Sequence, residues 1–355
     1  MKIKNNFNVH LYPSSGKHET RIFKSMDAAK NTGMFDKVIF FSQGDEQSPK
    51  RIISFNVTRS SSNFCYIAAS TIHLFKLRPR VINVHNWYSL LPAIILKILF
   101  HSKIIYEPHE VEFGTSYAEG TRSTFINILE SVSLKLFINE VIFVGQAVKN
   151  EYIRAYGNNN KVLSSMIYFS IPSKVSTQKN YDNVNKISYL GLFVDGRNIS
   201  SILESAKIRN DLIFEFIGHG PLKNKLNETA VKYDNINVVN SMNEEKLSIY
   251  LKSNIQIGLC LMNTHSLSNR CAAPNKFFTF VSNNIPVIVS PFGDQALLTH
   301  KYNLGKILDE VSPRSLIDAI DEIKSNEGGF GFENFKRNFS FSKQNKELED
   351  LYKRI

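Results

Sequence analysis

Short apolar runs alternate with helix-patterned segments along this chain, and the alternation limits the possible folds more than any other feature. In the first half, Lys37–Ser42, Arg80–His85 and Lys103–Tyr106 have the pattern of buried strands. Segments with helical spacing, Thr20–Thr32 and Leu90–Phe100 among them, stand between these strands. Such alternation is typical of a doubly wound α/β domain, in which helices cover a parallel sheet.

The pattern stops at a polar segment and then begins again. Residues 173–185 are mainly Ser, Thr, Gln, Lys, Asn and Asp, and we interpret them as a linker. Lys186–Leu190 and Leu212–Ile217 are the first strands of the second round. A chain of 355 residues is also long for one core. We therefore predict two Rossmann-like domains, at residues 1–172 and 186–335.

The charge is unevenly distributed between the two halves. Residues 1–172 contain 20 Lys and Arg against 12 Asp and Glu, which accounts for most of the net charge of +11. A basic half favours an anionic partner such as a membrane surface, a lipid phosphate or a nucleic acid, although a merely soluble basic surface would look the same. The basic residues are dispersed, without aromatic interleaving or a known reader motif, and we therefore predict no nucleic-acid partner.

The cellular location is predicted from cysteines and from the lack of apolar segments. Three scattered cysteines fit a reducing compartment better than a disulfide framework or a zinc site. The residues Met1–Asn6 lead into no apolar signal core. The longest apolar run, Leu90–Phe100, is interrupted by Lys97 and too short to cross a bilayer. We therefore predict a cytoplasmic protein.

A lysine near the end of the chain stands where an anion would bind. The stretch from Pro274 to Ser290 has the pattern of a loop, a helix, a tight turn and a strand, with Pro274 predicted at the first helical position. Lys276 then lies in the first helical turn, where free N–H groups already favour negative charge. A lysine at this place serves a bound phosphate better than it serves the helix. A surface lysine beside a buried helix fits the pattern equally well.

A second cation and two glycine turns accompany Lys276 in the second half. Arg197 opens a helix after Gly196, and Gly218-His219-Gly220-Pro221 forms a strand-to-helix turn. That turn lacks the third glycine of a dinucleotide fingerprint. Arg197 and Lys276 could together neutralise a diphosphate. Because the chain contains no Asp-x-Asp, we predict that protein cations rather than Mg²⁺ perform this task and that there is no metal ligand.

Two histidines follow strands of the first half. His85 ends one predicted strand, and His109 comes shortly after the next, beside Glu110 and Glu112. A histidine at a strand exit could act as a general base tuned by nearby carboxylates, or it could be a half-buried loop residue. Neither a Ser/His/Asp arrangement nor a metal-spaced histidine pair is present.

These motifs, in this order, resemble the GT-B glycosyltransferases, in particular the retaining family-4 type (glycosyl transferases group 1). The resemblance covers nearly the whole chain, and the order of the motifs is more specific than any one of them. The matching segments are Tyr106–Glu110, Tyr189–Gly191, Gly196–Ile199, Phe216–Pro221, Asn237–Glu244, Pro274–Phe278, Ile285–Ile288, Phe339–Ser342 and Leu348–Tyr352.

The resemblance implies an acceptor domain followed by a donor domain, with residues 336–355 forming a helix that crosses back to the first domain. It implies His109 and Glu110 as catalytic residues and no metal. The implied donor-binding residues are Gly191, Arg197, Gly218, His219, Gly220, Ser241, Met242, Asn275 and Lys276. The implied acceptor-side residues are Gly16, Arg21 and His85.

The chain departs from the family in one block. The family usually carries two glutamates eight positions apart, and here Cys271 and Thr279 occupy their places. The second glutamate normally binds the donor ribose and the first lies near the donor sugar. Recognition of the ribose and the stereochemical outcome are therefore left open.

The implied activity is hexosyl transfer without a cofactor, from a nucleotide-diphosphate sugar, with UDP favoured over GDP. The implied acceptor is lipid-linked or a polysaccharide, as in capsule or lipopolysaccharide assembly, with peripheral contact to the inner face of an anionic membrane. Leu90–Phe100 could take part in that contact or could be a buried crossover helix. A sugar-nucleotide epimerase on the same fold and an inactive, transferase-derived scaffold remain alternatives.

Overall fold

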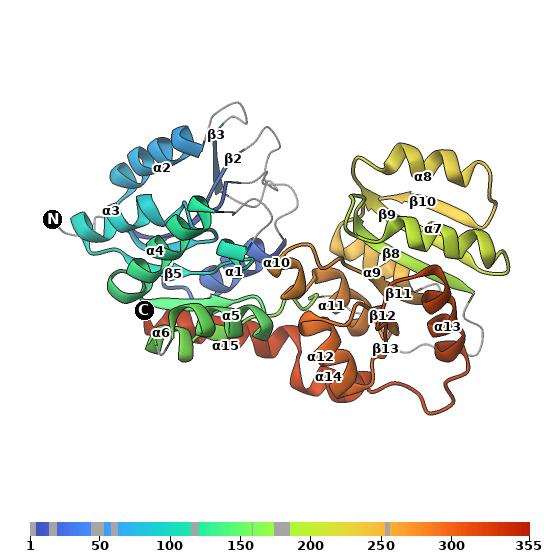
Figure 1. The fold of residues 1–355 in the computed structure, drawn as a ribbon. Helices are drawn as coiled ribbons and strands as arrows, with labels where there is room; N and C mark the ends of the chain where they lie inside the picture. Colours follow the sequence, from blue (N-terminus) through green and yellow to red (C-terminus); the bar gives the residue numbers. More distant parts are fainter. Residues whose placement is uncertain are drawn as a thin grey trace. The chain divides into compact units, whose positions relative to one another are not determined.

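The computed structural model describes residues 5–13, 20–43, 53–57, 63–114, 120–157, 159–173, 185–252 and 256–355 (Figure 1). It divides the chain into two compact units, Met1–Tyr168 with Ser342–Ile355, and Phe169–Phe341. Each unit contains one parallel sheet with helices packed on it. The predicted fold class, α/β with two Rossmann-like domains, is confirmed. Most of the predicted linker, residues 174–184, lies outside the described residues.

The sheet of the first unit has the strand order β3-β2-β1-β4-β5-β6-β7. The chain passes outward from β1 to β3, then returns to β4 on the other side of β1, so the order reverses between β1 and β4. Ligands of such sheets bind beyond the carboxyl ends of the strands at this reversal. The strands are β1 (Asn5–Leu11), β2 (Lys37–Gln43), β3 (Ile53–Val57), β4 (Pro79–Val84), β5 (Lys103–Tyr106), β6 (Glu140–Phe143) and β7 (Met166–Ile167).

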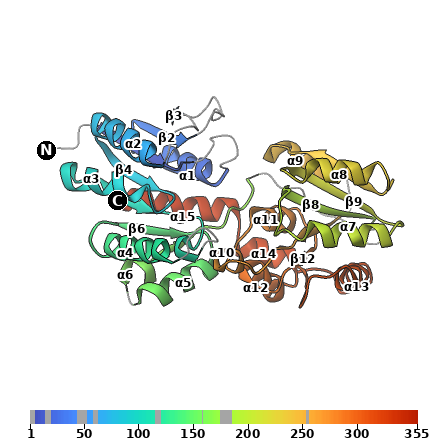
Figure 2. The same ribbon diagram turned by 45° about the horizontal axis from the view of Figure 1, so that its top comes forward.

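The helices of the first unit cover both faces of its sheet. Right-handed crossovers place α1 on one face and α2 to α5 on the other. The C-terminal helix α15 packs beside α1, where Leu348 and Leu351 join Ala28 and Ala29 in one buried cluster (Figure 2). The helices are α1 (Thr20–Asn31), α2 (Asn63–Leu77), α3 (Leu90–Phe100), α4 (Thr121–Leu136), α5 (Gln146–Tyr156), α6 (Asn160–Leu163) and α15 (Phe341–Arg354), with a 3₁₀ turn η1 (Glu112–Gly114).

The sheet of the second unit has the order β10-β9-β8-β11-β12-β13, which reverses between β8 and β11. Its strands are β8 (Lys186–Leu192), β9 (Ile213–His219), β10 (Ile236–Asn240), β11 (Gln256–Cys260), β12 (Val287–Val289) and β13 (Gly305–Ile307). Its helices are α7 (Ile199–Ile208), α8 (Lys223–Ala230), α9 (Glu244–Lys252), α10 (Leu267–Arg270), α11 (Asn275–Ser282), α12 (Gly293–Tyr302), α13 (Pro313–Lys324) and α14 (Phe332–Asn338).

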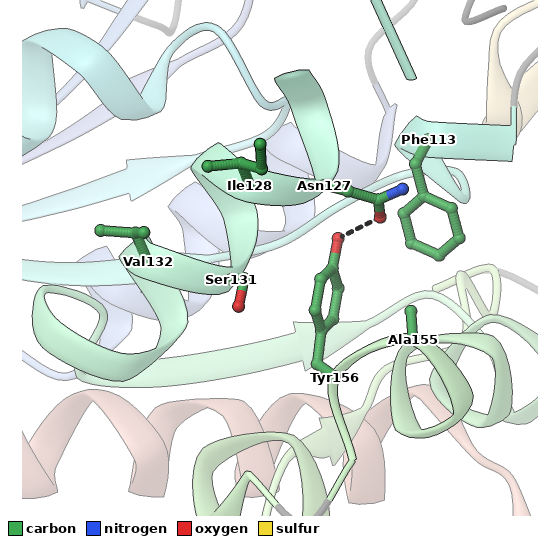
Figure 3. Close-up of a pocket in the computed structure, with 7 residues that line it drawn as sticks. All are labelled: Phe113, Asn127, Ile128, Ser131, Val132, Ala155 and Tyr156. Atoms are coloured by element: carbon green, nitrogen blue, oxygen red, sulfur yellow. Dashed lines mark hydrogen bonds between the residues drawn. The ribbon is translucent and has the colours of Figure 1, made fainter. Parts of the chain in front are cut away.

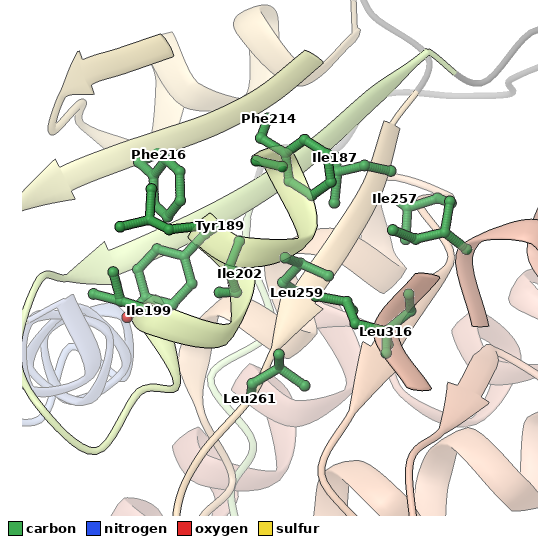
Figure 4. Packing of buried hydrophobic residues seen from close by; sticks show 14 of the residues in the cluster. Ile187, Tyr189, Ile199, Ile202, Phe214, Phe216, Ile257, Leu259, Leu261 and Leu316 are labelled. Carbon is green, nitrogen blue, oxygen red and sulfur yellow. The ribbon is translucent and has the colours of Figure 1, made fainter. Parts of the chain in front are cut away.

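The core of the second unit is built from strand side chains that meet helices on one face of the sheet. Tyr189 on β8 and Phe216 on β9 pack with Ile199 and Ile202 of α7, and Leu316 of α13 joins the same cluster (Figure 4). These apolar runs were the basis for predicting strands, and their burial explains why the prediction succeeds.

The structure differs from the sequence-based prediction at one helix start. Pro274 has extended backbone angles and is the residue before α11, so Asn275 rather than Pro274 is the first helical residue. A proline fits both positions, because neither needs its N–H within the helix. Lys276 still lies in the first turn. Within the part of the chain that is described, no helix has both the length and the apolar character needed to cross a bilayer.

Candidate functional site

Glycines allow the carboxyl ends of β8 and β9 to lie close together. A Cβ on Gly218 would lie 1.9 Å from the carbonyl oxygen of Gly191, and one on Gly220 would lie 2.6 Å from that of Phe193. The backbone N–H of Phe193 donates to the carbonyl of His219 at 2.7 Å. The predicted glycine turn therefore lets the two strand ends approach closely and keeps side chains away from the sheet edge.

Lys276 places a buried positive charge at the same edge. Its Nζ is inaccessible to solvent, has no hydrogen-bond partner, and lies 4.1 Å from the centre of the Tyr189 ring. Burial lowers the pKa of Lys276 to about 8, while Cys260 opposes this shift and Arg197 adds to it. Tyr189 and Cys260 belong to β8 and β11, so the ammonium lies where the strand order reverses. A buried cation without a partner is costly unless a ligand completes it.

Close packing of α11 on the sheet fixes the position of Lys276. A Cβ on Gly258 of β11 would lie 2.4 Å from the ring of Phe280 on α11. Only a glycine at this position allows the helix to lie so near the strand. The polar N-terminus of α11 and Lys276 are thereby set against the carboxyl ends of the central strands.

Arg197 is half-buried in the turn that precedes α7. Gly196 before it has a φ of +85° and Asn198 after it a φ of +53°. The turn is tied to the segment after β11 by the N–H of Asn263, which donates to the carbonyl of Gly196 at 2.9 Å. The charge of Arg197 adds to the lowering of the Lys276 pKa by burial and opposes the rise that burial causes in the pKa of Tyr189, so the two cations lie within electrostatic reach of each other.

The other predicted donor-side residues lie at the ends of neighbouring elements. His219 ends β9, Asn275 begins α11, and Ser241 and Met242 follow β10. The position of the family's second glutamate carries no acid here: Thr279 uses its hydroxyl to donate to the carbonyl of Asn275 at 3.1 Å. Cys271, at the position of the first, is buried.

In the first unit, three histidines form a continuous chain at the reversal between β1 and β4. His10 Nδ1 lies 3.0 Å from His85 Nε2, and His85 Nδ1 lies 3.2 Å from His109 Nε2. Burial lowers the pKa of His85 and of His109 to about 3, and that of His10 well below its usual value. The three imidazoles are therefore neutral at pH 7, and each carries one N–H.

Asparagines and a tyrosine extend this chain, and the backbone carbonyl of Val81, which can only accept, receives a hydrogen bond from the amide nitrogen of Asn8 at 3.5 Å. The amide nitrogen of Asn83 donates to the Tyr352 hydroxyl at 2.9 Å, and that of Asn8 donates to the Asn83 oxygen at 2.8 Å. The Asn8 oxygen lies 2.8 Å from His10 Nε2 and must therefore accept its proton. His10 then accepts from His85, and His85 accepts from His109 Nε2. This leaves the lone pair of His109 on Nδ1.

A buried carboxylate and a buried guanidinium flank the histidines. Glu107 lies 3.5 Å from His85 Nδ1 and 3.7 Å from His109 Nε2, and it accepts from Ser25 at 3.1 Å. Burial raises the pKa of Glu107, while His85 and Arg21 oppose the shift. The predicted acceptor-side residues Arg21 and His85 therefore lie beside His109. Gly16 lies outside the described residues.

The acid beside His109 is not the one expected from the sequence. Glu110 is exposed to solvent, whereas Glu112 is buried near Glu130. Burial raises the pKa of Glu112, and the charge of Glu130 raises it further. Glu107 takes the place expected of them. The sequence signal that could have identified Glu107 is its position as an acid directly after the apolar run of β5.

Among the described residues, one group could hold a metal ion. Ligand atoms of His85, Glu107 and His109 lie within 4.8 Å of one another, and neutral imidazoles with a carboxylate suit a transition metal. The nearby charge of Arg21 lowers the pKa of both histidines and would equally disfavour a divalent cation.

No family model and no curated protein matches the sequence. Solved structures do match over nearly the full length. The UDP-glucose complex of Anabaena Alr3699/HepE has a TM-score of 0.74 at 10% identity, covering 98% of this chain and 100% of that one. WaaG, a glycosyltransferase involved in lipopolysaccharide biosynthesis, has 0.70 at 11%, covering 98% and 99%. Sucrose-phosphate synthase from Thermosynechococcus elongatus has 0.72 at 12%, covering 99% of both chains. At such identities the likeness concerns the fold, and this chain has the two-domain GT-B fold of these glycosyltransferases.

Proposed function

We propose that this protein is a glycosyltransferase that uses a UDP-sugar donor. The observation that carries the proposal is the buried, unpartnered ammonium of Lys276 at the strand reversal of the second unit. Arg197 and the N-terminus of α11 add positive potential to the same region. A diphosphate would supply the missing partners, and the same groups would stabilise its charge as it leaves the sugar.

The described donor-side groups point to a reaction in which protein cations bind the diphosphate. They offer a lysine, an arginine and backbone N–H groups rather than a pair of carboxylates that would hold Mg²⁺. UDP is favoured as the nucleotide because HepE, which has the same fold, was solved with UDP-glucose and with UDP.

His109 has a positioning role in the proposed reaction. With a pKa of about 3, its imidazole is too weak a base to remove a hydroxyl proton efficiently at neutral pH. Its Nδ1 lone pair can still accept a hydrogen bond from a hydroxyl of the sugar or of the acceptor. Glu107 and His85 hold the ring in the orientation that this requires, and the charge of Arg21 helps to keep the ring neutral. Glu110, which is exposed, has no such contribution in this proposal.

The proposed acceptor is a lipid-linked saccharide or a polysaccharide, and the transferred group a hexose. The support is the shared fold of WaaG and of the lipopolysaccharide galactosyltransferase WaaB, together with the basic character of residues 1–172. The place of reaction in this proposal is the cytoplasmic side of a membrane.

Titration calorimetry with UDP and GDP tests the donor site in the full chain. Lys276→Met and Arg197→Gln should weaken UDP binding, whereas Lys232→Met, which changes an exposed lysine elsewhere in the second unit, should not. Mass spectrometry of reactions with a panel of UDP-sugars then separates the possible activities. A mass gain on an added acceptor supports transfer, an isomerised donor without acceptor supports epimerisation, and binding without turnover of any donor supports a scaffold.

A further inference from the structure

A pocket of about 390 Å³ lies between α4 and α5 in the first unit (Figure 3). This cavity, called the α4–α5 pocket below, is lined by Phe113, Asn127, Ile128, Ser131, Val132, Ala155 and Tyr156. Its volume falls at the lower end of the range of about 300–1,000 Å³ that is usual for small-molecule sites. The α4–α5 pocket therefore has the size of a site for a small ring compound.

Two aromatic rings form one side of the α4–α5 pocket. The centres of the Phe113 and Tyr156 rings lie 5.7 Å apart, with the ring planes at 86° to each other. The fully buried ring of Tyr152 contacts both, with its centre 5.5 Å from that of Phe113 and 5.4 Å from that of Tyr156. Because the buried ring fixes the other two, a ligand that stacks on them costs little additional side-chain entropy.

A buried carboxylate beneath the α4–α5 pocket fixes its polar side chains. Glu130 is fully buried and accepts hydrogen bonds from three tyrosine hydroxyls, those of Tyr106, Tyr152 and Tyr156. The Tyr156 hydroxyl also donates to Asn127 Oδ1 at 3.1 Å, which is the contact drawn in Figure 3. The amide oxygen of Asn127 is thereby turned toward Tyr156, and its nitrogen is left to donate to another group.

Asn127 and Ser131 give α4 a polar edge along the pocket. They are four residues apart, so their side chains lie on the same side of the helix. Within the described part of the chain, neither the Asn127 nitrogen nor the Ser131 hydroxyl has a hydrogen-bond partner. A purely apolar ligand would displace water from both groups and leave them without a partner, which is costly.

The described residues that line the α4–α5 pocket carry no charge at neutral pH. A phosphate or a carboxylate would therefore find no cation among them. A sugar ring suits both kinds of wall, because its apolar C–H faces stack on aromatic rings and the hydroxyl groups at its edges donate and accept hydrogen bonds. The chemistry of the pocket thus matches a neutral saccharide.

Phe113 connects the α4–α5 pocket to the histidine chain. It belongs to η1 and comes four residues after His109. Four residues of extended chain span at most about 14 Å, so a wall of the pocket lies within this distance of the His109 backbone. Both residues belong to the first unit. An oligosaccharide with one sugar at His109 can therefore reach the pocket with a sugar further along its chain.

We propose that the α4–α5 pocket is a distal acceptor subsite, which holds a neutral sugar residue of the acceptor that does not itself react. Phe113 and Tyr156 stack on the face of this sugar, and Asn127 and Ser131 form hydrogen bonds with its hydroxyl groups. That the sugar belongs to the acceptor rests on the proposed transferase function, whereas the binding of a saccharide depends on the pocket alone.

Ligand-observed NMR on the full chain tests the binding. The probes are the methyl glycosides of glucose, galactose, mannose and N-acetylglucosamine, and we expect at least one of them to bind with a Kd of about 1–10 mM. Ser131→Phe, which fills the pocket, and Phe113→Ala, which removes a stacking ring, should each weaken this binding at least fivefold. The matched control, Asn227→Phe at an exposed position of α8, should bind as the unchanged protein does, and so should His109→Ala.

The transfer reaction tests whether the bound sugar belongs to the acceptor. Since the pocket holds a sugar that does not react, Ser131→Phe should raise the KM for an oligosaccharide acceptor at least tenfold with kcat nearly unchanged. Asn227→Phe should change neither quantity. A KM equal to that of the unchanged protein would contradict the assignment of the pocket to the acceptor.

Several outcomes of the NMR experiment would overturn the proposal. They are no binding of any glycoside, binding that Ser131→Phe leaves unchanged, and binding that His109→Ala abolishes. Binding of cyclohexanol that Ser131→Phe prevents, without binding of any glycoside, would assign the pocket to an apolar ligand instead.

UDP affinity, measured on the same variants without saccharide, reports folding and separates the two proposals. A protein that binds UDP but no glycoside contradicts the subsite alone. A protein that binds a glycoside in the pocket but no UDP contradicts the proposed function and the assignment to an acceptor, and leaves the saccharide site in place.

Discussion

Replacing Lys276 by methionine should change stability and ligand binding in opposite directions. Methionine keeps most of the aliphatic volume and removes the charge. Burial shifts the pKa of Lys276 from 10.5 to about 8, which corresponds to a cost of about 3 kcal/mol for holding the protonated lysine in the folded state at pH 7. The cation–π contact with the Tyr189 ring offsets about 0.5–2 kcal/mol of this cost. The variant should therefore be more stable by about 1–3 kcal/mol.

The effect of pH follows from the same shift. Between pH 8 and 10.5 the unfolded chain keeps a proton on Lys276 that the folded chain has released. The free energy of unfolding of the unchanged protein therefore rises with pH across this window, and the advantage of Lys276→Met shrinks there. Below pH 8 the lysine is protonated in both states, and the advantage should be constant.

Binding of UDP should respond in the opposite sense. Loss of a charge-assisted contact to the diphosphate removes about 1.5–3 kcal/mol, or about 10- to 100-fold in Kd. Thermal unfolding without ligand gives the change in stability, and calorimetry with UDP gives the change in Kd, both at pH 7. A variant that is less stable than the unchanged protein, or one that binds UDP equally well, would refute the assignment of Lys276 as a cation held ready for an anion.

Three further changes test the parts around this lysine and the histidine chain. Gly258→Ala places a Cβ 2.4 Å from the Phe280 ring and should lower the free energy of unfolding by about 1–3 kcal/mol. Chemical denaturation should show a lower midpoint, and an unchanged midpoint would contradict the close packing of α11. Arg197→Gln removes a positive charge near Lys276, so the pKa of Lys276 should rise. The pH above which UDP affinity falls should therefore move upward. Calorimetry at several pH values would show no such movement if the two cations were far apart. His10→Leu removes the hydrogen-bond acceptor for His85, and His109 then loses its fixed orientation. The variant should lower kcat about 10- to 100-fold and leave UDP affinity unchanged. An equal loss in kcat and in UDP affinity would indicate general unfolding instead.

The alternation of strands and helices was sufficient to predict that Arg197 and Lys276 lie at the same edge of the second sheet. In a parallel doubly wound sheet every strand ends at the same edge, so a helix that follows a strand begins at that edge. Arg197 and Lys276 each stand at such a beginning, and their convergence follows without knowledge of any side-chain contact. The bounds of α3 were predicted to the residue, because Ser89 and His101 interrupt the apolar pattern on either side.

The burial of the Lys276 ammonium could not be predicted in the same way. It depends on the ring of Tyr189, on a strand almost ninety positions earlier in the chain, and on the closeness of α11 that Gly258 permits. Sequence periodicity assigns a residue to a face but does not say which other side chains it meets there. The choice between a surface lysine and a phosphate ligand was therefore left open by the sequence.

The histidine chain shows a different limit, because part of its signal was present in the sequence. The triplet Asn-Val-His occurs at residues 8–10 and again at 83–85. In a strand, positions i and i+2 point to the same side, and β1 pairs with β4 so that His10 is opposite Asn83. Two such triplets on paired strands bring two asparagines and two histidines together without any other information.

What the triplets do not supply is the direction of the hydrogen bonds along the chain. That direction is fixed where a side-chain amide meets a group that can only accept: the amide nitrogen of Asn8 donates to the backbone carbonyl of Val81 at 3.5 Å, which turns the Asn8 oxygen toward His10. The C-terminal helix is connected to His109 through four intervening side chains, Asn83, Asn8, His10 and His85. A helix that returns to the first unit in this way adds more than apolar packing, because its Tyr352 hydroxyl completes the hydrogen-bonded chain that ends at His109.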